Sequence, residues 1–187
     1  MTTPLECKTE YDFTLILAGG QDFSSEIADA LYAAGCDDAT LSVRAGRGVL
    51  AFSRAAPSLK AAILSAINDV WKAGVGLDVV RVDHCNLVTQ SDIARRIGRS
   101  RQLVHQYIIG ARGPGGFPAT VCDITDSTPL WYWCEVAYWL WENNMIKADA
   151  LEEAEEVAAI NNALEARYHR KRNPALAREM AAFVDSH

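Results

Sequence analysis

The chain has 187 residues, of which half are hydrophobic and 22% are charged, and its formal net charge is −6. This length can bury a core in two small domains, and the composition excludes disordered and fibrous classes. The most apolar stretch, Pro129–Trp141, is too short to span a bilayer and contains Glu135. The N-terminus lacks a basic region followed by an apolar run. We therefore expect a cytoplasmic protein without a membrane segment.

The five cysteines include no pair with Cys-x-x-Cys spacing. We expect them to be reduced residues that pack in the interior. Structural zinc needs four ligands with paired spacing, and the neighbouring His84 and Cys85 do not provide this. The sequence predicts no metal site and no cofactor.

Residues 1–83 alternate between strand and helix patterns. The predicted strands are Tyr11–Ala18, Ala39–Val43, Gly48–Ser53 and Leu77–Val82. One helix begins at a cap formed by Ser24 or Ser25 and ends at Gly35, and a second lies between Ser58 and Gly74. The second helix has an apolar stripe from Leu59 to Trp71 that must cover a sheet. The order β-α-β-β-α-β predicts a ferredoxin-like domain with a four-stranded antiparallel sheet, which serves in dimerisation, partner binding or ligand binding.

A helix-turn-helix pattern occupies Gln90–Ile109. In the first helix Ser91 is the expected cap, and Ile93, Ala94 and Ile97 point inward. Gly98 permits a tight turn, and Ser100 caps a second helix. In that helix Leu103, Val104 and Tyr107 point inward, while the outward residues are Arg101, Gln102, His105 and Gln106. The spacing of the small residue Ala94, the turn residue Gly98 and the inward apolar residues resembles the pattern of the helix-turn-helix family over about twenty residues.

The segment after this motif broadens the resemblance. Gly110–Pro118 is too rich in glycine and proline for a regular element. It precedes a predicted β-hairpin, a wing, made of Ala119–Ile124 and Thr128–Tyr132 around a turn at residues 125–127. An aromatic helix, Trp133–Asn143, follows and is apolar all round, which predicts burial on both sides. Residues 84–143 thus resemble the winged DNA-binding domains of phage excisionases and of the mercury-resistance regulator superfamily, although Cys134 replaces the expected helix cap.

The resemblance implies that the second helix lies in the major groove, with its outward residues at the base edges. Arginine can bond guanine and glutamine can bond adenine in bidentate fashion. The implied base readers are Arg101, Gln102, His105 and Gln106. The residues expected mainly at phosphates are Ser100, Arg99, Arg95, Arg96 and Arg112.

The local charge agrees with a nucleic-acid partner. Residues 84–116 hold five arginines and one aspartate, whereas residues 1–83 and 117–187 have net charges of −4 and −6. Electrostatic recognition depends on the local patch rather than on the net charge of the whole chain. The basic segment is therefore the predicted contact with DNA.

The C-terminal part is predicted to be helical. Asp149 with Glu152 suggests a capping box, Asn173 and Pro174 end one helix and begin another, and the last helix has an apolar face. The residues of that face are Leu176, Met180, Phe183 and Val184. The basic run Arg167–Arg172 complements a helix C-terminus or contacts phosphate, and both readings stay open.

These observations predict an α+β protein with a ferredoxin-like domain at 1–83, a winged helix-turn-helix domain at 84–146 and C-terminal helices at 147–187. We expect a homodimeric, sequence-specific transcriptional regulator of double-stranded DNA, a repressor, because two-fold dimers match palindromic half-sites. The dimer contact lies in the C-terminal helices or in the sheet. Alternatives are an antitoxin-like module that binds a toxin through residues 1–83, a ligand sensor, or a tryptophan platform for single strands. The sequence contains no nucleophile motif and no paired carboxylates, so we do not expect an enzyme.

Overall fold

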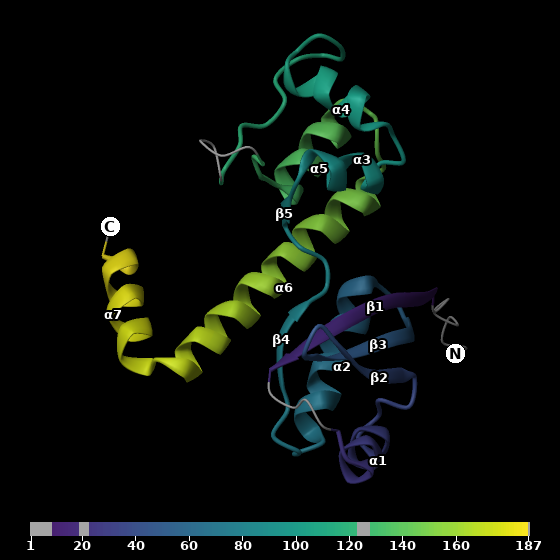
Figure 1. Cartoon of the computed structure of the whole chain (residues 1–187), viewed down its shortest axis with the longest axis vertical. Helices are drawn as coiled ribbons and strands as arrows, with labels where there is room; N and C mark the ends of the chain where they lie inside the picture. The colour runs from purple at the N-terminus through teal and green to yellow at the C-terminus, as the bar shows by residue number, and fades with distance from the viewer. Residues whose placement is uncertain (1–8, 19–22, 123–127, 187) are drawn as a thin grey trace, which may run out of the picture. The chain divides into compact units, whose positions relative to one another are not determined.

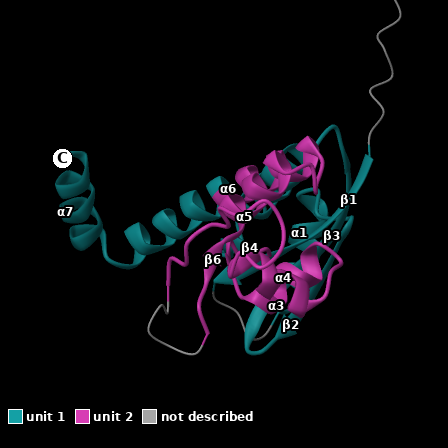
Figure 2. Ribbon diagram, turned by 90° about the horizontal axis from the view of Figure 1, so that it is seen from above, with its two compact units in different colours: residues 1–83, 159–187 teal, residues 84–158 magenta. Residues whose placement is uncertain are grey.

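The computed structural model describes residues 9–18, 23–122 and 128–186. The chain divides into two compact units, one made of residues 1–83 and 159–187 and the other of residues 84–158 (Figure 2). The sequence predicts boundaries after residues 83 and 146.

The first unit contains a sheet of four strands in the order β2-β3-β1-β4, and all neighbouring strands are antiparallel (Figure 1). The strands are β1 (Thr9–Ala18), β2 (Ala39–Arg44), β3 (Arg47–Ala56) and β4 (Asp78–Val82). From Leu50 to Ala56, alternate residues of β3 are buried, as in a strand with one face on a core. The α+β fold with a four-stranded antiparallel sheet, which the sequence predicts, is confirmed.

Two helices complete the predicted β-α-β-β-α-β order, α1 (Ser25–Ala33) and α2 (Leu59–Lys72). Ser58 Oγ accepts a hydrogen bond from the backbone N–H of Ala61 at 3.2 Å, so it caps α2 as predicted. Trp71 does not join the buried stripe of α2, because 39% of it is exposed. The Arg167 guanidinium instead lies 4.3 Å from the centre of its ring.

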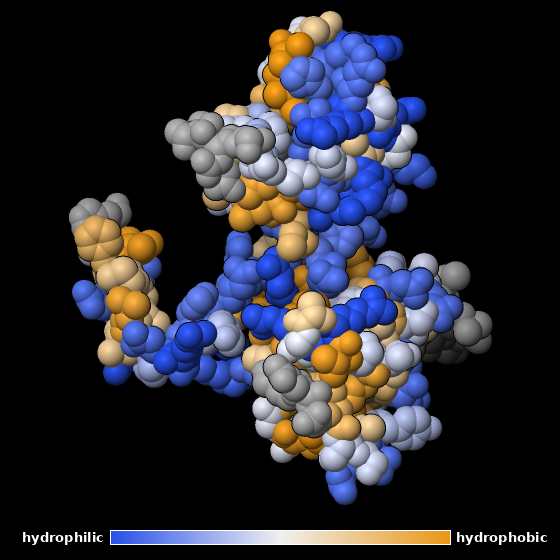
Figure 3. All heavy atoms as spheres, viewed as in Figure 1, coloured by the Kyte–Doolittle hydropathy of each residue, from blue (hydrophilic) through white to orange (hydrophobic). Residues whose placement is uncertain are grey.

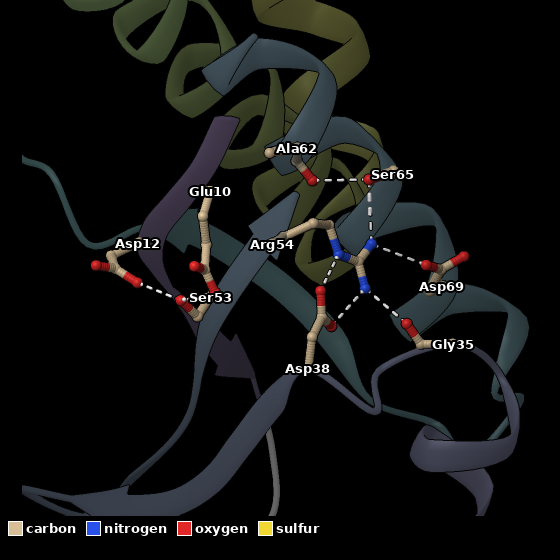
Figure 4. A network of polar contacts seen from close by, with 9 residues as sticks. All are labelled: Glu10, Asp12, Gly35, Asp38, Ser53, Arg54, Ala62, Ser65 and Asp69. Carbon is tan, nitrogen blue, oxygen red and sulfur yellow. Dashed lines mark hydrogen bonds and ion pairs between the residues drawn. The ribbon is translucent and has the colours of Figure 1, made fainter. Parts of the chain in front are cut away.

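Arg54 of β3 ties the sheet to the end of α1 and to α2 (Figure 4). Its guanidinium donates to both carboxylate oxygens of Asp38 (2.7 and 2.9 Å), to Asp69 (2.9 Å), to Ser65 (3.1 Å) and to the carbonyl of Gly35 (2.6 Å). The side chain is only 9% exposed. Hydrogen bonds to Asp38 raise the pKa of Arg54 above its ordinary value. A buried charge with these partners holds the elements in one arrangement.

Cys36 lies in the same core and is 4% exposed. Burial raises the pKa of its thiol to about 11. The unfolded chain loses this proton near pH 9, so the free energy of unfolding should fall as the pH rises from 9 toward 11, by at most about 1.4 kcal/mol per pH unit from this group. Urea unfolding of wild type and Cys36→Ala across this range checks the prediction. An unchanged difference between the two proteins would contradict it.

The C-terminal helices are α6 (Ala148–Arg172) and α7 (Pro174–Asp185), and α6 contributes residues to both units. Asn161, 3% exposed, accepts a hydrogen bond from the N–H of Val82 (2.7 Å) and donates to its carbonyl (3.3 Å). At the start of β4, Asp78 is paired with Lys171 (2.7 Å) and Arg167 (3.6 Å). These contacts fix the second half of α6 to the edge strand β4.

The second unit has a small core between three helices and a two-stranded sheet. The helices are α3 (Gln90–Arg96), α4 (Arg101–Ile108) and α5 (Trp133–Glu142), and the strands are β5 (Leu87–Val88) and β6 (Trp131–Tyr132). β5 and β6 are antiparallel. The buried core residues are Val88, Ile93, Ala94, Val104, Trp131, Val136, Trp139 and Leu140. The mostly helical region predicted after the sheet is confirmed.

Several local predictions for this region need correction. The hairpin is present only in part: Val121 donates to the carbonyl of Leu130 (2.8 Å) and Leu130 donates to that of Cys122 (3.1 Å), while the turn at residues 125–127 lies outside the described residues. Residues 131–132 pair with β5 rather than with residues 119–124. Tyr138 and Trp141 are 47% and 40% exposed, so α5 is not buried on both sides.

The predicted capping box at the start of α6 is also wrong. The helix begins at Ala148, so Asp149 lies inside the first turn rather than before it. Its Oδ1 accepts a hydrogen bond from the backbone N–H of Ala150 (2.9 Å). A carboxylate in the first turn still complements the positive end of the helix dipole.

Candidate nucleic-acid interface

α3 and α4 are joined by a tight turn at residues 97–100. Gly98 has a φ of +61°, a conformation that glycine adopts without steric cost. The backbone N–H of Arg99 returns to the carbonyl of Ala94 (2.9 Å), which closes the end of α3. Ile93, Ala94 and Val104 are buried in the core of the unit, as the sequence predicts. The small side chain of Ala94 suits a close approach of two helices.

The residue that caps α3 is Thr89, not the predicted Ser91. Thr89 Oγ1 accepts from the N–H of Asp92 (3.2 Å), and Asp92 accepts from the N–H of Thr89 (3.1 Å), which completes a capping box. Hydrogen bonds from Thr89 hold the pKa of Asp92 below its ordinary value. A hydroxyl residue followed three positions later by a carboxylate was the available sequence signal.

α4 presents a polar outer face. Ser100 caps the helix by accepting from the N–H of Leu103 (3.2 Å), as predicted. Arg101, Gln102 and His105 are exposed, and Gln106 is half-buried. Sequence reasoning missed Gln90, whose Nε2 donates to the carbonyl of Arg101 at 2.8 Å. This bond joins the first residue of α3 to the first residue of α4, so it fixes the end of α4 that carries the exposed side chains.

The glycine- and proline-rich loop after α4 is held in place by tryptophans. Trp139 Nε1 donates to the carbonyl of Gly115 (2.9 Å), and Trp131 Nε1 donates to that of Pro118 (3.1 Å). Gly113 has a φ of +87°, and a Cβ on it would lie 3.0 Å from the ring of Tyr107. The chain therefore passes close over α4 because glycine stands at this position.

The five arginines of the basic segment differ in their surroundings. Arg99, Arg101 and Arg112 are exposed, and the N–H of Arg112 donates to the carbonyl of Gln106 (3.1 Å). Arg95 is exposed as well but forms an ion pair with Asp92 (2.7 Å).

Arg96 is placed differently from the other four arginines. Its guanidinium lies 4.8 Å from the centre of the Trp133 ring and donates to the carbonyl of Cys85 (2.7 Å). Burial lowers its pKa from the ordinary value. The side chain therefore already serves to pack α3 against α5 within the unit.

The aromatic side chains of this unit gather mainly in its core. Trp131 and Trp139 are 2% and 5% exposed, and Phe117 packs against both, with ring centroids 6.3 and 5.0 Å apart. The ring of Tyr107 lies 5.5 Å from that of Trp139. Such residues support the α4 surface from beneath rather than offer free faces for stacking bases.

Within residues 9–18, 23–122 and 128–186, no three His, Cys, Asp or Glu side chains gather as a metal site would require. No helix in those ranges is long and apolar enough to cross a bilayer. Comparison with protein-family models, with curated proteins and with solved structures gives no match for this chain.

Proposed function

We propose that the second unit binds double-stranded DNA, with α4 in the major groove, and that the protein is a sequence-specific transcriptional regulator. One observation carries the proposal: a tight turn at Gly98 joins two short helices whose inner faces are buried, while the N-terminal half of α4 exposes Arg101, Gln102 and His105. Helix-turn-helix proteins read bases with the same end of their second helix.

Arg101 and Gln102 are the proposed base readers. Both are exposed in the first turn of α4, where the free N–H groups and the positive end of the helix dipole favour approach to a phosphate backbone. Arginine can bond guanine O6 and N7, and glutamine can bond adenine N6 and N7. His105 and Gln106, one turn later, complete the proposed reading face.

Phosphate contacts are proposed for the exposed cations around α4. Arg99 lies in the turn before α4 and Arg112 in the loop after it, and both are exposed. Ser100 and Arg95 lie beside them. Arg96 has no phosphate role in this proposal, because its guanidinium is committed to Trp133 and to the carbonyl of Cys85.

The remaining parts of the chain fit accessory roles in this proposal. The paired segments at Val121–Cys122 and Leu130 would be the base of a wing beside α4. The sheet of the first unit, with its β2-β3-β1-β4 order, would be a ferredoxin-like domain. A homodimeric repressor would place two copies of α4 on half-sites about 34–36 Å apart or a multiple of this.

Replacement of Arg101 or Gln102 by alanine should weaken specific binding by about 1–3 kcal/mol each, or roughly 5- to 150-fold, through lost base contacts. The operator can be found by selection of the purified full-length protein on a pool of random-sequence duplexes. Mobility shifts on the selected duplex then measure the affinity of each variant.

Arg99→Ala should instead weaken binding to all duplexes alike, because a phosphate contact reads no sequence. The slope of the logarithm of the binding constant against the logarithm of the salt concentration should become shallower by about 1.

Arg47→Ala is the matched control, because Arg47 is an exposed arginine in β3 of the other unit and should leave binding unchanged. Circular dichroism verifies that each variant is folded. If the Arg101→Ala, Gln102→Ala double variant selects the same sequences with the same affinity as wild type, α4 does not read DNA. If the wild-type protein enriches no sequence, the function itself is wrong.

A further inference from the structure

α7 is an amphipathic helix whose apolar side chains stay largely exposed among the described residues, although Leu176 and Met180 line a hollow with Arg172 at the end of α6. Leu176, Met180 and Val184 recur at four-residue intervals and are 49%, 46% and 70% exposed. No residue of α7 is buried in the described structure. A 12-residue helix is marginally stable in water unless its apolar face packs on something. The apolar side chains along this helix appear in Figure 3 as orange patches on its surface.

The first unit also contains an apolar groove of about 430 Å³ between α2 and the second half of α6. Leu64 and Trp71 line one side and remain 49% and 39% exposed. Ile160 and Leu164 line the other side together with Arg167 and Arg170, and the Arg167 guanidinium lies 4.3 Å from the centre of the Trp71 ring. Exposed apolar side chains gathered in a groove indicate an interaction surface.

The groove and the helix match in length and in charge. From Leu176 to Val184 the apolar stripe of α7 is about 12 Å long, and from Leu64 to Trp71 the groove wall is about 10 Å long, at 1.5 Å per residue. Glu179 is one residue from Met180 and lies at the margin of the stripe. Arg170 is exposed and makes no ion pair in the described residues. The helix thus carries a carboxylate at the margin of its stripe, and the groove has a cation of opposite charge in its lining.

The α7 of the same chain cannot fill this groove. α6 ends at Arg172 and α7 begins at Pro174, so a single residue, Asn173, joins them. The N–H of Asn173 donates to His169 and its carbonyl accepts from Ala177, which places it in both helical ladders. An antiparallel return of one helix onto another requires a loop of about 2–5 residues. Figure 1 shows α7 turning away from the line of α6 at this elbow.

We propose that the occupant is a second copy of this chain, with α7 of each copy seated in the α2–α6 groove of the other. A two-fold arrangement buries both stripes and both grooves at once and leaves no further copy of either surface open. This inference is independent of DNA binding, because it uses none of the residues of α3 or α4.

The full-length protein should be a dimer by sedimentation equilibrium or light scattering. Met180→Glu and Leu64→Glu place a charge on the two contacting faces, and each should raise the dissociation constant about tenfold or more. Ala182→Glu is the matched control, because it adds the same charge to an exposed position on another face of α7 and should leave the dimer intact. Circular dichroism and thermal unfolding confirm that the variants are folded.

A mixing experiment distinguishes the groove from simple pairing of two α7 helices. Met180→Lys and Leu64→Glu chains should each be mainly monomeric. An equimolar mixture of the two should form a heterodimer. In that heterodimer Lys at position 180 of one chain faces Glu at position 64 of the other, and the second interface is wild type. A wild-type chain that stays monomeric at all concentrations would overturn the proposal. So would a Leu64→Glu chain that dimerises as tightly as wild type.

Discussion

Replacing Arg54 by methionine should lower the free energy of unfolding by about 3–5 kcal/mol, although methionine has a similar length. Arg54 is the only cation in the network of Figure 4, where it pairs with Asp38 and Asp69. Without it, Asp38 loses the cation that it contacts, at 28% exposure, and Asp69, at 17% exposure, keeps only its ion pair with the exposed Lys72 (3.3 Å). Urea unfolding followed by circular dichroism measures the loss.

The matched control is Arg47→Met, an exposed arginine in the same strand, which should change stability by less than about 0.5 kcal/mol. The triple variant that adds Asp38→Asn and Asp69→Asn should recover part of the loss, because it removes the uncompensated charges. If Arg54→Met alone costs less than about 1 kcal/mol, the network does not hold the sheet to its helices.

Replacing Trp139 by alanine should destabilise the second unit by about 3–5 kcal/mol. Trp139 is 5% exposed, packs against Tyr107 and Phe117, and donates a hydrogen bond to Gly115. Its loss leaves a cavity beneath α4 and frees the loop that follows this helix. Native-state hydrogen exchange measures the effect unit by unit, with the amides of β1 and β3 as the internal reference.

Trp139→Phe separates packing from the hydrogen bond. Phenylalanine retains an aromatic ring but cannot donate to Gly115, so we expect a cost of about 1 kcal/mol from the lost bond, plus that of a smaller cavity. Equal protection of α3 and α4 amides in wild type and Trp139→Ala would show that the aromatic core does not support the reading helices.

The sequence predicts those elements whose signals are local and periodic. The apolar repeat of α2 and the alternation in β3 depend only on side-chain spacing, so both elements were found with bounds within a few residues. The two-residue strands β5 and β6 are too short to show a period, and they pair across more than 40 residues of chain. Spacing within α2 places Trp71 in the buried stripe, but it does not reveal the contact of its ring with Arg167, which lies nearly 100 residues away in the sequence.

The candidate interface follows the same division between local and distant effects. Ser100, Gly98 and the exposed side chains of α4 are set by the geometry of one turn and one helix, which spacing reveals. Arg96 was grouped with the phosphate contacts because it belongs to a basic run. Its actual neighbours, Trp133 and Cys85, come from separate segments that only the folded unit brings together.

The bond between Asn161 and Val82 has a consequence for how the protein is made. The two residues are 79 positions apart, and the unit that contains them is interrupted by residues 84–158. During synthesis the interrupting unit leaves the ribosome before the second half of α6, so the N–H and carbonyl of Val82 lack this partner until residue 161 has been made. We therefore expect nascent chains halted before residue 159 to present an unfinished sheet edge to chaperones and proteases.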